Sequence, residues 1–157
     1  MSNTLKLVIS IGVCFVAAAL GSVATNPAIA TWYASLKKPS FQPPNWLFGP
    51  VWTILYIAMG IALFLVWRQG WSSPRVRTGV ILFGVQLVLN SFWSILFFGL
   101  HQPLAGLIEI VLLWVVVLLT TLVFFGVSVT AGALLVPYII WISFATILNA
   151  AIVHLNR

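Results

Sequence analysis

The chain has 157 residues, of which 62% are hydrophobic and only 5% are charged, and its formal net charge is +6. A soluble domain carries about a quarter charged residues, so this composition excludes an ordinary water-soluble domain and favours a protein whose solvent is the lipid bilayer. The length fits a single domain over residues 1–157. The basic residues form no cluster of the kind that binds nucleic acid, so we expect a basic rim facing lipid headgroups instead.

Long runs without Lys, Arg or Asp dominate the sequence, and Glu109 is the only charged residue inside them. Each run is close to the roughly 20 residues that a helix needs to cross the bilayer. The runs lack the alternation of barrel strands, so they predict an all-α membrane protein, a bundle of five transmembrane helices. The five runs cover residues 7–24, 48–67, 79–98, 103–125 and 131–153.

The first run has a second interpretation as a secretory signal peptide. Lys6 precedes the apolar stretch, and the sequence AIA at residues 28–30 is similar to a cleavage site. Cleavage would leave four spans instead of five. For the uncleaved chain, the distribution of Lys and Arg between the two sides favours an N-terminus on the inner side of the membrane.

Residues 25–44 form the one long connection between spans. The stretch LKKPSFQPPNWLFGPVW at residues 36–52 holds four of the eight prolines. Proline favours stiff, extended chain, so we predict that this first loop acts as a semi-rigid lid. Asn45 is predicted to cap the second long helix, and Ser73 and Gln102 are predicted to cap the third and fourth.

Counting the spans places the first loop, the third loop and the C-terminus on one side of the membrane. The helical rise of 1.5 Å per residue then puts several polar and aromatic side chains in the leaflet beneath the first loop: Trp52, Asn90, Trp93, Glu109 and Asn149. Helical spacing gathers aromatic and amide side chains on inward faces of the second, third and fifth spans, which predicts a pocket for a planar, largely apolar ligand. The alternative is that these stripes only pack helix against helix, with the two asparagines as interhelical hydrogen-bond partners.

The remaining polar residues give weaker signals. Glu109 is a functional candidate because a carboxylate inside a membrane is costly, although His101 or water is an alternative local partner. His101 and His154 are of the type that ligates haem iron, but each lies at a helix end, where a polar residue is ordinary. Cys14 fits as a small apolar residue. We therefore predict no cofactor and no metal site.

Three stretches carry a family resemblance: WYASLKKPSFQPPNWLFGPVWTILYIAMGIALFLVW at residues 32–67, LNSFWSILFFG at 89–99 and VPYIIWISFATILNA at 136–150. They resemble the signatures of the tryptophan-rich sensory protein (TspO) family, which includes the mitochondrial translocator protein. The resemblance covers nearly the whole chain. It implies a five-helix bundle, commonly dimeric, that binds porphyrins such as protoporphyrin IX, sterols and benzodiazepine-site ligands.

Carried over position by position, the resemblance implies a set of ligand-binding residues: Trp52, Asn90, Trp93, Trp141, Ala145 and Leu148. We also predict that Lys37 and Lys38, in the first loop, pair with porphyrin carboxylates. The chain departs from the family pattern at Ala105, where many members have an aromatic residue. The C-terminal ILNAAIVHLNR lacks the tyrosine of the sterol-recognition pattern, so that motif predicts no sterol site.

The expected function is that of a membrane receptor for porphyrins and related hydrophobic ligands, acting in tetrapyrrole transport or stress sensing in a bacterial inner membrane. The alternative is an enzyme that degrades porphyrin with light and oxygen, with Trp52 and Trp141 as redox partners. A structural scaffold without a ligand is a third reading. The small-residue pairs Ala17–Gly21 and Ala58–Ala62 favour close helix contact or a homodimer, which the resemblance also implies.

Overall fold

A computed structural model describes all 157 residues, and it contains five long helices and no strands. The long helices are α1 (Asn3–Ile29), α3 (Asn45–Trp67), α4 (Pro74–Ser94), α5 (Pro103–Phe125) and α6 (Val129–Leu155). A short helix α2 (Trp32–Ser35) follows α1, and a π-helical turn η1 (Ile95–Gly99) continues α4. All five long helices have the length and hydropathy of a membrane span, which confirms the predicted all-α bundle.

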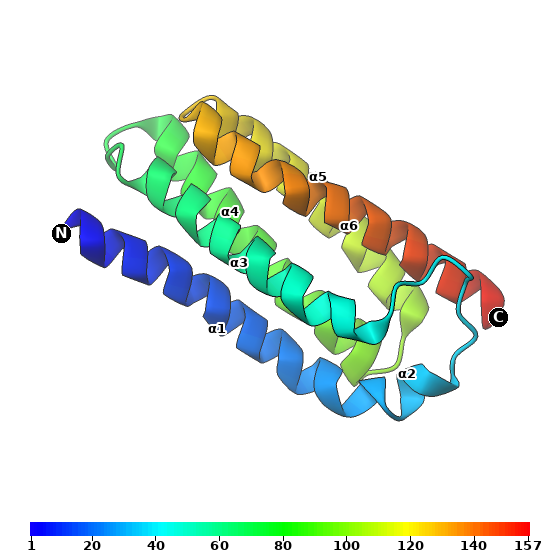
Figure 1. Ribbon diagram of the computed structural model, residues 1–157. Coiled ribbons are helices and arrows are strands. Elements are labelled where there is room, and N and C mark those ends of the chain that lie inside the picture. The colour runs from blue at the N-terminus through cyan, green and yellow to red at the C-terminus, as the bar shows by residue number, and fades with distance from the viewer.

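The helices lie side by side, with the N- and C-termini at opposite ends, as an odd number of spans requires (Figure 1). The first span is part of the bundle, because Cys14, Ala17 and Gly21 of α1 are buried. The structure therefore has five spans, with the first packed against the others.

The helix starts follow local sequence chemistry, with one correction. The Ser2 and Ser128 hydroxyls accept hydrogen bonds from the backbone N–H groups of Leu5 and Ala131, which caps α1 and α6. The prediction that Asn45 caps the second long helix is wrong. Pro44 occupies the cap position and Asn45 is already helical, because the fixed φ of proline suits the residue that leads into the first turn.

The first connection is shorter than the predicted residues 25–44. Helix α1 continues through Pro27 to Ile29, and α2 follows almost at once. The extension is favourable because it buries Ala28, which is only 4% exposed. Only residues 36–44, the proline-rich part, join α2 to α3 without a helix. The action of this segment as a lid stays a prediction.

Helix α1 contacts two different neighbours along its length. Near its start it meets α3 so closely that a Cβ added at Gly60 would lie 2.7 Å from the Cα of Ile11. Farther along it meets α4, where the Ser91 hydroxyl donates to the backbone carbonyl of Ala17 at 3.1 Å. Gly21 lies against Ser94 in the same contact. The Ala17–Gly21 pair therefore makes the close helix contact that its spacing predicted.

The close approach at Gly60 gives a stability prediction. We expect Gly60→Ala to lower the free energy of unfolding by about 1–3 kcal/mol, because the added methyl group would force backbone apart. Thermal unfolding in detergent measures this effect. Gly84→Ala is the matched control, since no atom lies within 4 Å of a Cβ added there. Equal melting temperatures for the two variants would contradict the prediction.

Candidate functional site

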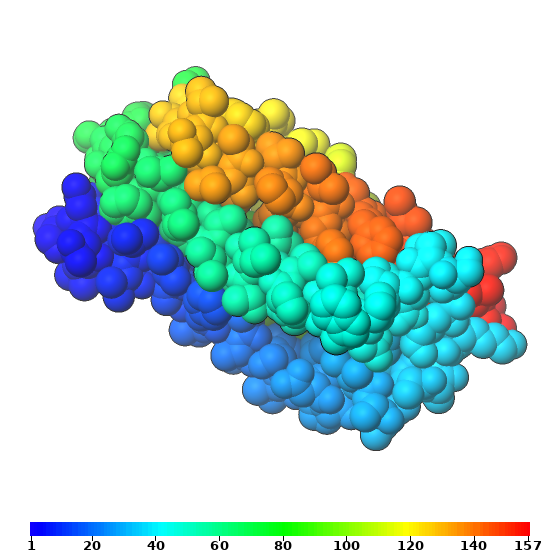
Figure 2. Space-filling model, in the orientation of Figure 1, coloured from blue at the N-terminus to red at the C-terminus, as the bar shows by residue number.

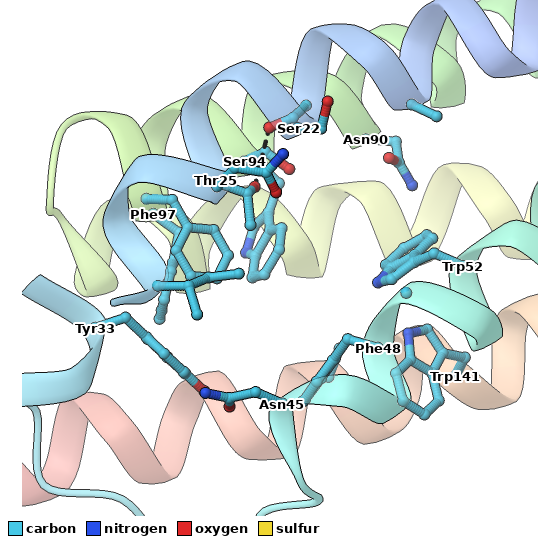
Figure 3. A pocket seen from close by; sticks show the side chains of 18 of the residues that line it. Ser22, Thr25, Tyr33, Asn45, Phe48, Trp52, Asn90, Ser94, Phe97 and Trp141 are labelled. Atoms are coloured by element: carbon cyan, nitrogen blue, oxygen red, sulfur yellow. Dashed lines mark hydrogen bonds between the residues drawn. The ribbon is translucent and has the colours of Figure 1, made fainter. Parts of the chain in front are cut away.

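A cavity of about 460 Å³ lies inside the bundle, towards the end that carries α2 and the first connection. Its walls come from α1, α3, α4, η1 and α6, with Tyr33 of α2 at one end (Figure 3). A volume of this size is typical of a small-molecule site. Of the 25 lining residues 15 are hydrophobic, and most of the others are Ser, Thr or Asn.

Six of the eight residues proposed from the sequence line this cavity: Trp52, Asn90, Trp93, Trp141, Ala145 and Leu148. Their contact with a ligand stays a prediction, but the structure brings them together from three helices. Lys37 and Lys38 are not among the lining residues. The Lys38 ammonium donates to the backbone carbonyl of Leu36 at 3.2 Å and lies 4.8 Å from the ring of Tyr33. Pairing of the two lysines with porphyrin carboxylates stays untested.

One wall of the cavity is built from aromatic rings of α3 and α6. Trp52 lies with its ring centroid 5.6 Å from that of Tyr56, and Phe48 meets Trp141 edge to face at 5.7 Å. Figure 3 shows Phe48, Trp52 and Trp141 on the same side of the cavity. Because aromatic rings attract other planar π-systems through offset and edge contacts, this wall suits a flat ligand.

The opposite wall is held by α4 and η1. Trp93 stacks on Phe97 at 5.2 Å between centroids, and its indole N–H donates to the side-chain oxygen of Asn149 at 3.1 Å. The amide of Asn149 donates in turn to the backbone carbonyl of Pro103 at 2.9 Å. These bonds join α4, α5 and α6, so Asn149 has the interhelical role that was the alternative to a pocket. A π-helical turn is common at functional sites, and here it carries Phe97.

Asn90 belongs to a buried chain of hydrogen bonds that we call the polar chain. The Tyr56 hydroxyl donates to the Asn90 oxygen at 2.7 Å, and the Asn90 amide N–H donates to the Tyr138 oxygen at 2.8 Å. The Tyr138 hydroxyl donates to the Gln86 oxygen at 2.8 Å, and the Gln86 amide faces the Met59 sulfur at 3.8 Å. The polar chain joins α3, α4 and α6 beneath the aromatic wall.

The thioether of Met59 fixes the direction of every bond in the polar chain. A thioether can only accept, so the amide N–H of Gln86 points to it and the Gln86 oxygen is left to accept from Tyr138. Tyr138 then uses its only hydroxyl hydrogen as a donor to Gln86, so its oxygen accepts the hydrogen bond from the Asn90 amide. The second amide N–H of Asn90 has no partner within the protein, and Asn90 lines the cavity. Trp141 also lines the cavity, and its indole N–H is buried without a partner in the protein.

Glu109 lies apart from this cavity. Its side chain is 6% exposed, and neither carboxyl oxygen has a hydrogen-bond partner. The suggested partner, His101, instead stacks on Trp32 with ring centroids 4.5 Å apart, and its backbone has a positive φ of 55°. No group of three or more His, Cys, Asp or Glu side chains is arranged to hold a metal ion.

One wall of the cavity was not predicted from the sequence. Helix α1 lines the cavity with Phe15, Ala18, Gly21, Ser22, Thr25, Asn26 and Ile29, none of which was proposed as a site residue. The Ala17–Gly21 spacing predicted a close contact, but not which helix it would meet or what the neighbouring residues would face. Helical spacing predicts aromatic side chains on the inward faces of the second and fifth spans, but the hydrogen bonds of Tyr56 and Tyr138 to Asn90 depend on the packing of three helices.

Comparison with known proteins agrees with this architecture. Residues 10–155 match the model of the TspO/MBR family. The chain belongs to this family. It is 51% identical over 152 residues to the tryptophan-rich protein TspO of Chlorobaculum tepidum, a match that covers 97% of this chain and 96% of the relative. With its five helices of spanning length and hydropathy, this TspO/MBR family member is an integral membrane protein.

Two further relatives show the breadth of the family. The chain is 49% identical over 155 residues to the tryptophan-rich protein TspO of Archaeoglobus fulgidus, covering 98% of this chain and 99% of the relative. It is 41% identical over 119 residues to the human translocator protein, covering 75% of this chain and 70% of that protein. The matched residues 10–155 include the three signature stretches and every residue that lines the cavity.

The polar chain gives a prediction for the TspO/MBR fold. We expect Tyr138→Phe to lower the free energy of unfolding by about 1–3 kcal/mol, because the buried Asn90 N–H and Gln86 oxygen would each lose a partner. Thermal unfolding in detergent measures the change. Tyr33→Phe is the control, since the Tyr33 hydroxyl makes no hydrogen bond within the protein. A loss of similar size in both variants would show that the polar chain adds nothing.

Proposed function

We propose that this protein is a membrane receptor that binds porphyrins and related planar hydrophobic molecules in the cavity, and acts in tetrapyrrole transport or stress sensing. The observation that carries the proposal is the cavity itself. It combines flat aromatic walls from Trp52, Trp93 and Trp141 with hydroxyl and amide side chains that can form hydrogen bonds. A planar macrocycle with a largely apolar surface and ring nitrogens is a ligand of matching chemistry.

The relatives' names support a receptor or carrier role. One relative is named translocator protein and another, from Cereibacter sphaeroides, is named tryptophan-rich sensory protein. We propose a bacterial inner membrane as the location and a homodimer as the assembled form. The sterol-recognition pattern is absent at the end of α6, so sterol is not the ligand that we propose.

Porphyrin binding is tested by titrating protoporphyrin IX into the reconstituted protein and following porphyrin fluorescence anisotropy. We expect saturable binding to the wild type, and an affinity about tenfold weaker for Trp52→Ala because the variant loses an aromatic face of the cavity. Trp71→Ala is the control, since Trp71 is exposed and lies outside the cavity. Equal affinities of the two variants would place the porphyrin elsewhere, and no saturable binding to the wild type would refute the proposal.

A second candidate function is the oxidative degradation of porphyrin under light. It is favoured by the presence of two tryptophans, Trp52 and Trp141, on one wall of the same cavity, where an excited ligand would contact an oxidisable indole. The excited porphyrin and dissolved oxygen supply the reactivity, so no acid–base residues are needed.

Illumination separates the two functions. If the protein is an enzyme, porphyrin absorbance in the aerobic complex should bleach faster than that of free porphyrin, and Trp52→Phe and Trp141→Phe should each slow the bleaching while retaining the ligand. The dark complex is the control. Bleaching of the wild-type complex at the rate of free porphyrin would leave binding as the function.

A further inference from the structure

The cavity is exposed on one side of the bundle only. Of the residues that line it, those with exposed side chains or backbone all belong to α1 and α3: Phe15, Asn26, Asn45, Trp46, Gly49 and Thr53. The lining residues from α2, α4, η1 and α6 are buried or half-buried. We call the border formed by the six exposed residues the lateral opening. Figure 2 shows the two helices that bound it side by side on one face of the molecule, with α1 in blue and the start of α3 in cyan.

Helix packing explains why the opening lies there. Helix α1 is tight against α3 at Gly60, towards the end of the bundle away from the cavity. Beside the cavity it is held instead by α4, through the Ser91 bond to Ala17 and the contact of Gly21 with Ser94. The same contacts that hold α1 on α4 therefore leave it apart from the first turns of α3.

The lateral opening lies at the depth of the bilayer. At 1.5 Å per residue, Thr53 is about 12 Å along α3 from its first residue, and Phe15 is about 21 Å from the end of α1. The opening thus extends from the membrane surface to near the bilayer centre. Neighbouring side chains that point outward on the same helices are apolar, including Val16 at 59% and Ile54 at 66% exposed.

Three hydroxyl groups beside the opening need no hydrogen bond to water. Ser22 donates to the carbonyl of Ala19 at 2.8 Å, Thr25 donates to Gly21 at 2.9 Å, and Thr53 donates to Gly49 at 2.9 Å. Each hydroxyl is satisfied by its own helix, which is the usual arrangement for Ser and Thr in hydrocarbon. Lipid chains can therefore contact these three hydroxyl-bearing residues without leaving a hydroxyl donor unpaired.

The end of the cavity that faces water is closed by contacts. Trp32 of α2 stacks on His101, and Tyr33 is 5% exposed. The side-chain amide of Asn156 donates to the carbonyl of Lys37 at 2.8 Å and accepts from its N–H at 2.9 Å, which ties the first connection to the C-terminal end of α6. A ligand arriving from water would have to break these contacts, whereas one arriving from the bilayer meets an existing opening.

We propose that the ligand of this cavity passes between the bilayer and the binding site through the lateral opening between α1 and α3, and not through the first connection. This inference rests on the proposed function, because it assumes that the cavity holds a planar hydrophobic ligand. It adds that the ligand first dissolves in the membrane. The first connection then acts as a fixed cover.

Gly49→Phe tests the route, because Gly49 is on the border and no atom lies within 4 Å of a Cβ added there. With protoporphyrin IX already in the vesicle membrane, stopped-flow fluorescence should show association and dissociation each slowed about tenfold, with the dissociation constant changed less than about twofold. Gly84→Phe, at an equally open glycine of α4 outside the cavity, should leave both rates unchanged.

Asn156→Ala separates the two routes. It removes both bonds to Lys37 without touching the cavity, so the lateral route predicts unchanged rates. Faster association in Asn156→Ala, together with unchanged rates in Gly49→Phe, would overturn the inference.

A measurement without ligand keeps the inference separate from the proposed function. A fluorophore attached at Gly49→Cys, in a Cys14→Ala background, should be quenched by nitroxide-labelled lipid chains and not by a water-soluble quencher. The reverse pattern would show an opening filled by water and would overturn the inference, even if porphyrin binds. Lipid quenching with no porphyrin binding to the wild type would instead refute the proposed function and leave a membrane-facing opening.

Discussion

Hydrocarbon offers no hydrogen-bond partners, so a polar side chain inside a spanning bundle must find its partner within the protein. The polar chain from Tyr56 through Asn90, Tyr138 and Gln86 is how this protein meets that requirement at the centre of the fold. It joins α3, α4 and α6 and lies directly beneath the aromatic wall. The geometry of the cavity therefore depends on the same bonds that hold the helices together.

The direction of those bonds has a chemical consequence for the site. Because Met59 can only accept, Asn90 uses its oxygen and one N–H within the protein and has one N–H without a partner. Trp141 adds an unpaired indole N–H nearby. A ligand acceptor atom placed against Asn90 would pair its second N–H, which would couple ligand binding to the stability of the bundle.

Close helix contacts determine how the cavity is reached. Gly60 brings α1 against α3 at one end of the bundle, and Ala17 and Gly21 bring it against α4 at the other. The resulting gap between α1 and α3 faces the bilayer. At the end of the cavity that faces water, Asn156 holds the first connection and His101 holds α2 in place. A receptor for membrane-dissolved molecules gains from this arrangement, since its ligands are concentrated in the lipid.

The sequence by itself determined the five spans and their approximate bounds, because hydropathy and helical length depend only on residues along one helix. It also placed six cavity residues on the correct inward faces. It did not determine the α1 wall, the lateral opening or the position of the lysines. Those features depend on which helices touch and how closely they approach. Small residues such as Gly21 and Gly60 allow a close approach, but the distance also depends on the residue that each one meets on the neighbouring helix. The bond direction set by Met59 likewise exists only once α3, α4 and α6 have packed together.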